Sequence, residues 1–316
     1  MRTALYDAYG GPEVLYQATV PTPTIGPDEV LVRVRAAGVN GADLMTRSGK
    51  LRLTTRGPFP RGTGIDFTGE VADFGRAVSG LGVGDHVWGL LPRGASGSVA
   101  EYVAVPVRKL SLAPEGLDLV QAAALPTVGT TAITALRDKA RLEPGERLLV
   151  RGAGGGVGSA AIQLGNAYGA HVTALAGAHN LDLVSDLGAH AAFDHRATDA
   201  EGLGPFDVVL DTVGTELSRY RGLLAPRGRM ISITVDPRRI VQSLAYILGS
   251  RVGGRRPIQF FSGNPDQHLF TDLARCVQDG LLRPVIHDVY PLADIAKAHR
   301  AMESGGSRGK HVIRID

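Results

Sequence analysis

Hydrophobic and polar residues follow two different patterns in the two parts of the chain. The first 110 residues form short segments separated by glycine and proline, and in residues 30–36 valine occupies every second position up to residue 34. Apolar residues at every second position are typical of a half-buried β-strand. The same reasoning predicts further strands at 69–72, 85–88 and 99–105. We therefore expect a strongly bent β domain in this part of the chain.

From about residue 114 onward, short apolar segments alternate with longer segments of helical period. Strands are predicted at 147–150, 171–175, 191–193, 207–210, 229–234 and 310–315. Helices are predicted at 121–124, 129–139, 159–168, 180–187, 217–224, 267–279 and 292–304. Strands that alternate with helices of about ten residues form a parallel, doubly wound sheet. The predicted fold class is therefore α/β, with this sheet joined to a second, β-rich domain.

Length and composition are those of a globular protein. The chain has 316 residues, 44% of them hydrophobic and 21% charged, which argues against disorder and allows about two domains. Its single cysteine, Cys276, excludes an intrachain disulfide and a four-cysteine zinc site. The N-terminus lacks the apolar core of a signal peptide, and the apolar run at 120–125 is far shorter than a membrane span. We expect a cytoplasmic protein with no membrane-spanning segment.

The distribution of charge adds one ambiguous feature. The net charge is +3, and most arginines are interleaved with acidic residues, which argues against a general nucleic-acid surface. Two local clusters stand out: Arg238 with Arg239, and Arg251 with Arg255 and Arg256. They are either solvated surface or a site for an anionic ligand such as a cofactor phosphate.

A glycine-rich loop lies between a predicted strand and a predicted helix, where a dinucleotide-binding fingerprint belongs. In the pattern A-x-G-x-x-G, Gly155 would let the backbone approach a pyrophosphate and Gly158 would let the helix pack against the strand. The helix N-terminus would direct its free N–H groups toward the phosphates. A tight glycine turn without a ligand is the alternative. The candidate cofactor residues of this loop are Ala153, Gly155, Gly156, Val157 and Gly158.

The end of the second strand of this unit favours NADP(H) over NAD(H). A site specific for NAD places Asp or Glu about 20 residues after the glycines to bond the ribose 2′-hydroxyl. In this chain the stretch 175–180 contains no acid, and the first one is Asp182. His179 is the only side chain in the stretch that can carry a positive charge, and Asn180 beside it is neutral. We therefore expect NADPH, held in part by His179 and Asn180.

Several motifs, in their order and spacing, resemble the medium-chain dehydrogenase/reductase superfamily. They are residues 36–43 (AAGVNGAD), 64–71 (GIDFTGEV), 82–87 (GVGDHV), 125–131 (LPTVGTT), 153–158, 211–214 (DTVG) and 309–312 (GKHV). The chain is most similar to the zinc-free quinone oxidoreductase, or zeta-crystallin-like, branch. The resemblance implies a GroES-like substrate domain formed by residues 1–120 and 262–316. It also implies a Rossmann dinucleotide-binding domain at 121–261 and a homodimer or tetramer.

The resemblance also bears on metal binding. Zinc-dependent relatives have a cysteine at the position of Asn40 and a His-Glu pair at the positions of Ile65 and Asp66. Isoleucine cannot bind a metal, and an asparagine is a poor zinc ligand. A catalytic zinc needs about three protein ligands with nitrogen, sulfur or carboxylate donors. We therefore predict that the protein binds no zinc at this position.

Without a Lewis acid, the expected chemistry is hydride transfer from NADPH to a carbon that is already electrophilic, as in a quinone or an α,β-unsaturated carbonyl. By resemblance, Asn40 is the candidate to hold the acceptor oxygen, since its amide can donate; a loop amide satisfied by backbone is the alternative. Asp43 either fixes this loop or acts directly. The tyrosine that relatives often carry after the Ser48-Gly49 pair is replaced by Lys50 and Leu51, so the proton donor is not identified.

Further positions carry a cofactor role only through the resemblance. Thr127 and Thr130 correspond to residues near the nicotinamide, with ordinary helix capping as the alternative. Val213 and Gly214 correspond to residues that line the dinucleotide cleft. His195 stands where relatives often carry a tyrosine near the 2′-phosphate. Residues 48–60 and 240–261 correspond to variable loops that form the substrate pocket.

Two other functions compete with a quinone or enone reductase. The first is an enoyl reductase acting on thioesters or in polyketide tailoring, which would need a basic path such as residues 251–256. The second is a non-catalytic protein that binds NADPH or RNA, and the dispersed arginines argue against RNA. The expected partners are a small-molecule substrate and a second copy of the chain, without nucleic acid or membrane.

Overall fold

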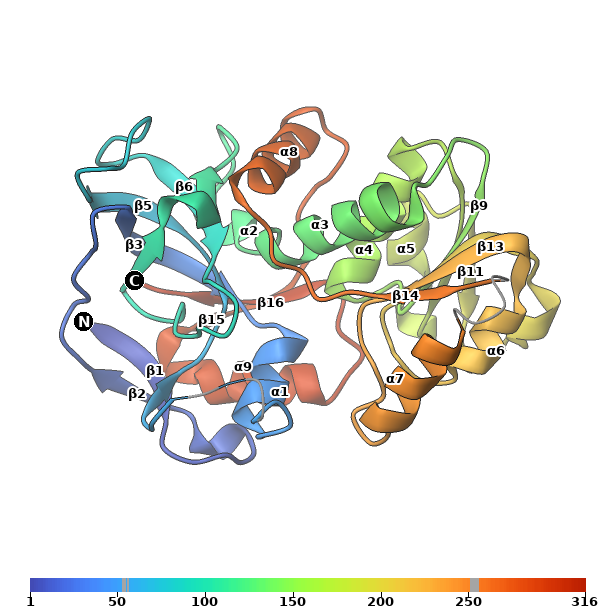
Figure 1. Cartoon of the computed structure of the whole chain (residues 1–316), viewed down its shortest axis with the longest axis horizontal. Helices are drawn as coiled ribbons and strands as arrows, with labels where there is room; N and C mark the ends of the chain where they lie inside the picture. The colour runs from blue at the N-terminus through green and yellow to red at the C-terminus, as the bar shows by residue number, and fades with distance from the viewer. Residues whose placement is uncertain (53–54, 56, 251–255) are drawn as a thin grey trace. The chain divides into compact units, whose positions relative to one another are not determined.

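The computed structural model describes residues 1–52, 55, 57–250 and 256–316. The chain forms two compact units. The first unit comprises residues 1–130, 264–280 and 284–316, and the second comprises residues 131–263 and 281–283. Figure 1 labels the helices and many of the strands of both.

The first unit is built on β-sheets. A seven-stranded sheet has the order β15-β16-β3-β5-β6-β8, with β7 also paired to β3, and a three-stranded sheet has the order β2-β1-β4. The strands of the larger sheet are β3 (Glu29–Gly38), β5 (Asp66–Phe74), β6 (His86–Leu90), β7 (Tyr102–Pro106), β8 (Leu110–Leu112), β15 (Ile286–Pro291) and β16 (Lys310–Arg314). The smaller sheet contains β1 (Arg2–Tyr6), β2 (Tyr16–Thr19) and β4 (Arg61–Gly62).

Strand β3 confirms the alternation found in the sequence. Val30, Val32 and Val34 are all buried in the core of the first unit, because successive side chains of a strand point to opposite faces. The strand predicted at 99–105 is shorter than expected and begins at Tyr102. Ala100 instead forms an isolated bridge with Thr3, so this part of the segment contacts β1.

Five helices accompany these sheets: α1 (Gly41–Arg47), α2 (Leu119–Ala122), α3 (Pro126–Ile133), α8 (Gln267–Gln278) and α9 (Ile295–Glu303). Helix α1 was not predicted, although it follows directly on β3. Its last residue, Arg47, is 1% exposed and pairs with Glu303, so that α1 lies beside α9 (Figure 1). Asp118 is the N-cap of α2 and Asp266 is the N-cap of α8. Each carboxylate accepts hydrogen bonds from backbone N–H groups of the first turn.

The second unit has the predicted parallel, doubly wound sheet. Its strands are β9 (Arg147–Arg151), β10 (His171–Ala176), β11 (Ala191–Asp194), β12 (Phe206–Asp211), β13 (Leu224–Ser232) and β14 (Ile258–Phe260). Their order is β11-β10-β9-β12-β13-β14, and each pair is parallel. The order therefore reverses between β9 and β12. In open α/β sheets, ligands bind at the carboxyl ends of the strands at such a reversal.

The helices of this unit are α4 (Gly156–Ala167), α5 (Leu181–Asp186), α6 (Leu217–Gly222) and α7 (Ile240–Gly249). Two predictions for this region are wrong. Residue 224 belongs to a strand and not to a helix, because β13 begins there and pairs with β12. The segment 240–261 is not a plain loop, because Ser243, Ile247 and Ser250 recur at helical spacing as buried residues and residues 240–249 form α7. Among the described residues, no helix is long and apolar enough to cross a bilayer.

Candidate active site

A buried hydrogen-bond network lies in the first unit where three segments of the chain meet. Asn40 follows β3, Asp66 begins β5 and Lys310 begins β16. These side chains are 6%, 0% and 4% exposed, respectively. β3 pairs with both β5 and β16, so the larger sheet brings together residues that are distant in the sequence.

The amide of Asn40 is held at both ends. Its Oδ1 accepts a bond of 2.6 Å from the Nζ of Lys310, which also donates to the carbonyl of Val39 at 2.7 Å. Its Nδ2 donates to Oδ1 of Asp66 at 3.2 Å and to the carbonyl of Gly38 at 3.3 Å. The contacts therefore fix the orientation of the amide, with its oxygen toward a cation and its N–H groups toward a carboxylate and a carbonyl.

The carboxylate of Asp66 accepts further hydrogen bonds beside Asn40. Its Oδ1 also accepts from the backbone N–H of Gly38 at 2.9 Å, and its Oδ2 accepts from the hydroxyl of Thr127 at 2.6 Å. A Cβ atom at Gly38 would lie 2.9 Å from Oδ1 of Asp66 and 2.9 Å from Cε of Lys310. A glycine is needed here because the backbone passes directly beside the carboxylate and the lysine stem.

Asp43 supports this network from the first turn of α1. Its Oδ2 accepts the backbone N–H of Asn40 at 2.8 Å, an N-terminal capping contact. Burial, and secondly the carboxylate of Asp66, raise the pKa of Asp43 to about 7, although the bond from Asn40 acts in the opposite direction. Burial also lowers the pKa of Lys310, while Asp66 and Asp43 act to raise it. One buried cation thus faces two buried carboxyl groups.

The glycine-rich loop lies in the second unit, between β9 and α4. Gly155 is the N-cap of α4, and Gly152 has a φ of +74°. A Cβ atom at Gly158 would lie 2.3 Å from the carbonyl oxygen of Gly152 and 2.7 Å from Cα of Ala153. Gly158 therefore allows the first turn of the helix to contact the loop backbone. The free N–H groups of this turn form an anion-binding helix N-terminus.

A buried ion pair stabilises the neighbouring strand ends. Nη1 of Arg151, at the end of β9, is 3.1 Å from Oδ1 of Asp211, at the end of β12. The carboxylate of Asp211 also accepts the backbone N–H groups of Val213 at 3.1 Å and Gly214 at 3.0 Å. A Cβ atom at Gly152 would lie 3.0 Å from Cγ2 of Val213, so the structure brings the segment 213–214 and the glycine loop together. Burial raises the pKa of Asp211, against the opposite effect of Arg151.

Comparison with known proteins agrees with this architecture. Residues 26–115 match the family described as the alcohol dehydrogenase GroES-like domain, and residues 187–313 match the family described as zinc-binding dehydrogenase. The chain is 33% identical to the human mitochondrial NAD(P)H oxidoreductase RTN4IP1, over 98% of this chain and 88% of that protein. It is 34% identical to the quinone oxidoreductase of Sus scrofa, over 97% of this chain and 95% of that protein.

The chain belongs to the medium-chain dehydrogenase/reductase superfamily. Within it, the protein is a quinone oxidoreductase-like member, with a GroES-like sheet domain and a Rossmann-like domain. The solved quinone oxidoreductase of Coxiella burnetii matches the structure with a TM-score of 0.89 at 29% identity, covering 100% of this chain and 99% of that one. The protein is therefore an oxidoreductase that uses a nicotinamide cofactor.

The superfamily includes zinc enzymes, but the residues around Asn40 do not fit a catalytic zinc. Of Asn40, Ile65 and Asp66, only Asp66 is a common zinc ligand. The ammonium of Lys310, bonded to Oδ1 of Asn40, would repel a second cation there. Among the described residues, no three His, Cys, Asp or Glu side chains converge around Asn40.

The predicted residues for the 2′-phosphate lie together at the end of β10. His179 is exposed and lies in a short 3-10 helix at 178–180, and Nδ1 of His195 is 2.8 Å from the carbonyl oxygen of Ala176. A Cβ atom at Gly177 would lie 3.0 Å from the ring of His179 and 4.0 Å from that of His195. Asn180 is buried instead, and its Nδ2 would be 2.3 Å from a Cβ at position 154, so its side chain faces the glycine loop.

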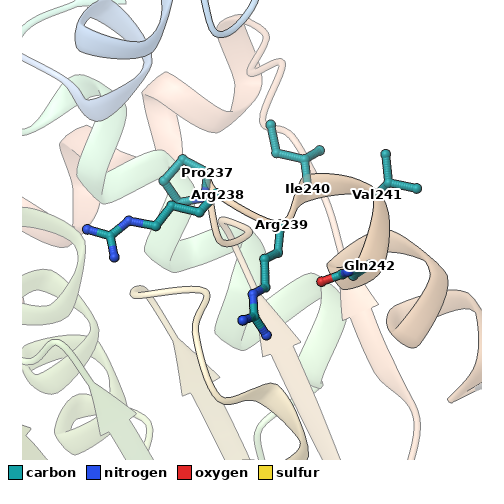
Figure 2. Close-up of a pocket in the computed structure, with 6 residues that line it drawn as sticks. All are labelled: Pro237, Arg238, Arg239, Ile240, Val241 and Gln242. Carbon is teal, nitrogen blue, oxygen red and sulfur yellow. The ribbon is translucent and has the colours of Figure 1, made fainter.

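The other predicted positions fall into four groups. Thr127 contacts Asp66, whereas the hydroxyl of Thr130 bonds back to the carbonyl of Pro126 at 2.5 Å, as expected for a helical threonine. Lys50 and Leu51 lie in a turn after α1. Arg238 and Arg239 border a hollow lined by residues 237–242, and their guanidinium groups point in different directions (Figure 2). They do not converge on one anion. Arg251 and Arg255 lie outside the described residues.

Sequence reasoning missed the central position of Lys310 and the pair formed by Arg151 and Asp211. Each was visible as a charged residue at one end of a strand that contains apolar residues. Such a residue is buried by its neighbours and must find a partner there. The sequence does not reveal which partner, because the contacts cross from one strand to another.

We expect Gly158→Ala to weaken binding of the nicotinamide cofactor at least about tenfold, because the new methyl group displaces the loop backbone from the phosphates by a contact of 2.3 Å. Fluorescence titration with the reduced cofactor measures the dissociation constant. Gly222→Ala is the matched control, since no atom lies within 4 Å of a Cβ at that helical position. Equal affinity of the Gly158→Ala variant and the wild type would contradict the assignment of this loop.

We expect the pKa of Asp43 to be visible in protein stability. A folded-state pKa of about 7, against 3.8 for the free group, means that the folded protein retains a proton that the unfolded chain has lost. The free energy of unfolding therefore falls as pH rises from about 4 to 7, by about 1 kcal/mol per pH unit from this group.

The substitution Asp43→Asn removes that dependence and keeps an acceptor for the N–H of Asn40. Urea unfolding at pH 5 and pH 7 measures it, with the exposed Asp182→Asn as control. The wild type and the control should lose more stability between the two pH values than Asp43→Asn. Equal losses in all three proteins would contradict the perturbed pKa.

Proposed function

We propose that the protein is an NADPH-dependent, zinc-independent reductase of quinones or activated α,β-unsaturated carbonyls. The contact between the ammonium of Lys310 and Oδ1 of Asn40, 2.6 Å long and buried, carries the proposal. By the resemblance, Asn40 stands where zinc enzymes of the superfamily have a metal ligand, and a lysine ammonium contacts it here. Acceptors that are already electrophilic do not need a Lewis acid, and quinones and enones are such acceptors.

The bound nicotinamide would supply the hydride, and this chain would supply orientation and a hydrogen bond to the acceptor oxygen. Asn40 is the residue proposed for that bond. Its contact with the carbonyl of Gly38 is the longest in the network, at 3.3 Å, so this N–H is the one proposed to donate to a substrate oxygen without rotation of the amide. Lys310 polarises the amide through Oδ1 and thereby strengthens its N–H groups as donors.

Asp66 and Asp43 act as positioning residues in this proposal. Asp66 holds the other N–H of the Asn40 amide, and Asp43 holds its backbone. Neither has to exchange a proton with the substrate. The proton that the reduced acceptor takes up comes from a source other than these two carboxyl groups.

The preference for NADPH rests on the end of β10. His179 and His195 border Gly177 there, and residues 175–180 contain no carboxylate that would repel a 2′-phosphate. Thr127, Val213 and Gly214 are the further positions proposed to contact the cofactor. The homodimer and the cytoplasmic location stay predictions, and the human relative is named as mitochondrial.

We expect oxidation of NADPH, and slower oxidation of NADH, when the protein is offered a simple quinone or an enone. The near-ultraviolet absorbance of the reduced cofactor measures both rates. Both acceptors belong in the assay because each is electrophilic without a metal. If NADH proved the better donor, the assignment of the 2′-phosphate site would be wrong; silence of both cofactors with both acceptors would overturn the proposed substrate class.

We expect Asn40→Ala to lower kcat by about 10²–10³, the range seen when a donor to a developing oxyanion is removed. Its dissociation constant for NADPH should stay within about twofold, since the glycine loop is unchanged. The variant also leaves Lys310 and Asp66 each short of a bond, so thermal unfolding must first show that it is folded. Asn166→Ala, an exposed position on α4, is the control. An unchanged kcat would remove Asn40 from the mechanism.

A further inference from the structure

A second group of chemically active side chains lies at the edge of the larger sheet, on β15 and β16. It consists of His287, Asp288 and His311, and one ligand atom from each lies within 4.8 Å of the other two. None of them bonds to Asn40, Asp66 or Thr127 in the network described above. Among the described residues, this is the one place where three such side chains converge.

The convergence results from an irregularity in strand pairing. Ile286 pairs with Lys310 and Asp288 pairs with His311, so β15 has one extra residue, His287, between two consecutive partners on β16. In a regular strand, adjacent side chains point to opposite faces, whereas a bulge directs two successive residues toward the same partner. His287 and His311 have their ring centroids 4.7 Å apart, and Nε2 of His287 is 3.8 Å from Oδ2 of Asp288.

The burial and hydrogen bonding of His311 suit a histidine that binds a metal ion. It is 1% exposed, and its Nε2 lies 2.9 Å from the hydroxyl of Ser307. Its Nδ1 is buried and, among the described residues, has no hydrogen-bonding partner. Buried polar atoms nearly always have a hydrogen-bonding partner, so a bound ion would account for the position of this nitrogen. In a metal-binding histidine the other ring nitrogen usually bonds to a carboxylate, a carbonyl or water, and here the hydroxyl of Ser307 takes that place.

The surroundings keep the imidazole in the form that binds metals. Burial, and secondly His287, lower the pKa of His311 to about 4, so that it is neutral at physiological pH. Lys310 acts in the same direction, and Asp288 in the opposite one. Asp288 also accepts a bond of 3.2 Å from the hydroxyl of Tyr290. Binding through Nε2 of His287 requires its ring proton to move to Nδ1, which then gives up a long bond of 3.2 Å from the N–H of Arg308.

We propose that His287, Asp288 and His311 bind a divalent transition-metal ion such as Zn²⁺. Two imidazole nitrogens and one carboxylate oxygen form a donor set that suits zinc and not the all-oxygen preference of Mg²⁺ or Ca²⁺. With three protein ligands, water completes a tetrahedral site. The ion would bridge β15 to β16, one residue from Lys310, and would support the strand that holds the buried network. It takes no part in hydride transfer.

Zinc itself is the probe, titrated by calorimetry into the untagged full chain carrying Cys276→Ser, which removes the only thiolate. We expect one zinc per chain and a rise in Tm, because an ion that binds only the folded state stabilises it. His287→Gln should weaken binding at least about tenfold. His287 is exposed, so the variant is expected to fold. The exposed His268→Gln and the network variant Asn40→Ala should bind zinc as before.

Each outcome of the titration either supports or contradicts the proposed metal site. Saturable binding that His287→Gln weakens and His268→Gln does not would support it. Absence of saturable binding, or equal affinity of His287→Gln and its parent, would overturn it. Loss of zinc binding in Asn40→Ala would instead place the metal in the buried network and would contradict the zinc-independent mechanism. Cofactor oxidation is not the readout, so the two proposals fail separately.

Discussion

The ammonium of Lys310, buried against the amide of Asn40, is the contact on which the first unit depends. A charged group removed from water is costly unless other groups surround and compensate it. Here the compensation comes from Val39 and Asn40 directly and from Asp66 through Asn40. The lysine lies on β16 near the C-terminus, whereas its partners lie near the start of the chain. The order of strands in the larger sheet therefore brings these distant residues together in one hydrogen-bond network.

In the proposed mechanism, the same contact distinguishes this protein from the zinc enzymes of its superfamily. Where a metal would polarise a carbonyl, this chain has an amide polarised by a lysine. An amide N–H is a weaker electrophile than zinc, so it suits acceptors that are activated by their own structure. Quinones and enones meet that condition, and simple ketones do not. Burial and the nearby carboxylate of Asp66 raise the pKa of Asp43, so the charged groups around Asn40 lie close together and away from water.

The second unit and the strand-helix alternation were largely predictable, because apolar strands and glycine positions have local causes. Gly158 is required by a contact within its own loop, and the sequence shows the loop. Lys310 was not predictable as a site residue, because its partners are set by the pairing of strands distant in sequence. Helix α7 was missed because the resemblance suggested a loop and its Ser243 disguises a helical pattern. Helix α1 was missed because it follows directly on β3 and begins with Gly41, a poor helix former.

The bulge at His287 illustrates the same limit from another side. Nothing in the sequence of β15 indicates an extra residue, and a regular strand would have separated His287 from Asp288. Irregular pairing is decided by the register of the partner strand, which pattern analysis does not contain. Chemical function at such a point becomes visible only in three dimensions.

Turnover measured before and after removal of metal distinguishes a mechanism based on Asn40 and Lys310 from one based on zinc. The protein is dialysed against a strong chelator, its zinc content is determined, and NADPH oxidation with a quinone is compared before and after. The zinc-independent mechanism predicts the same kcat in zinc-depleted and untreated protein. A loss of turnover that added Zn²⁺ restores, in a sample whose fold is intact, would contradict it.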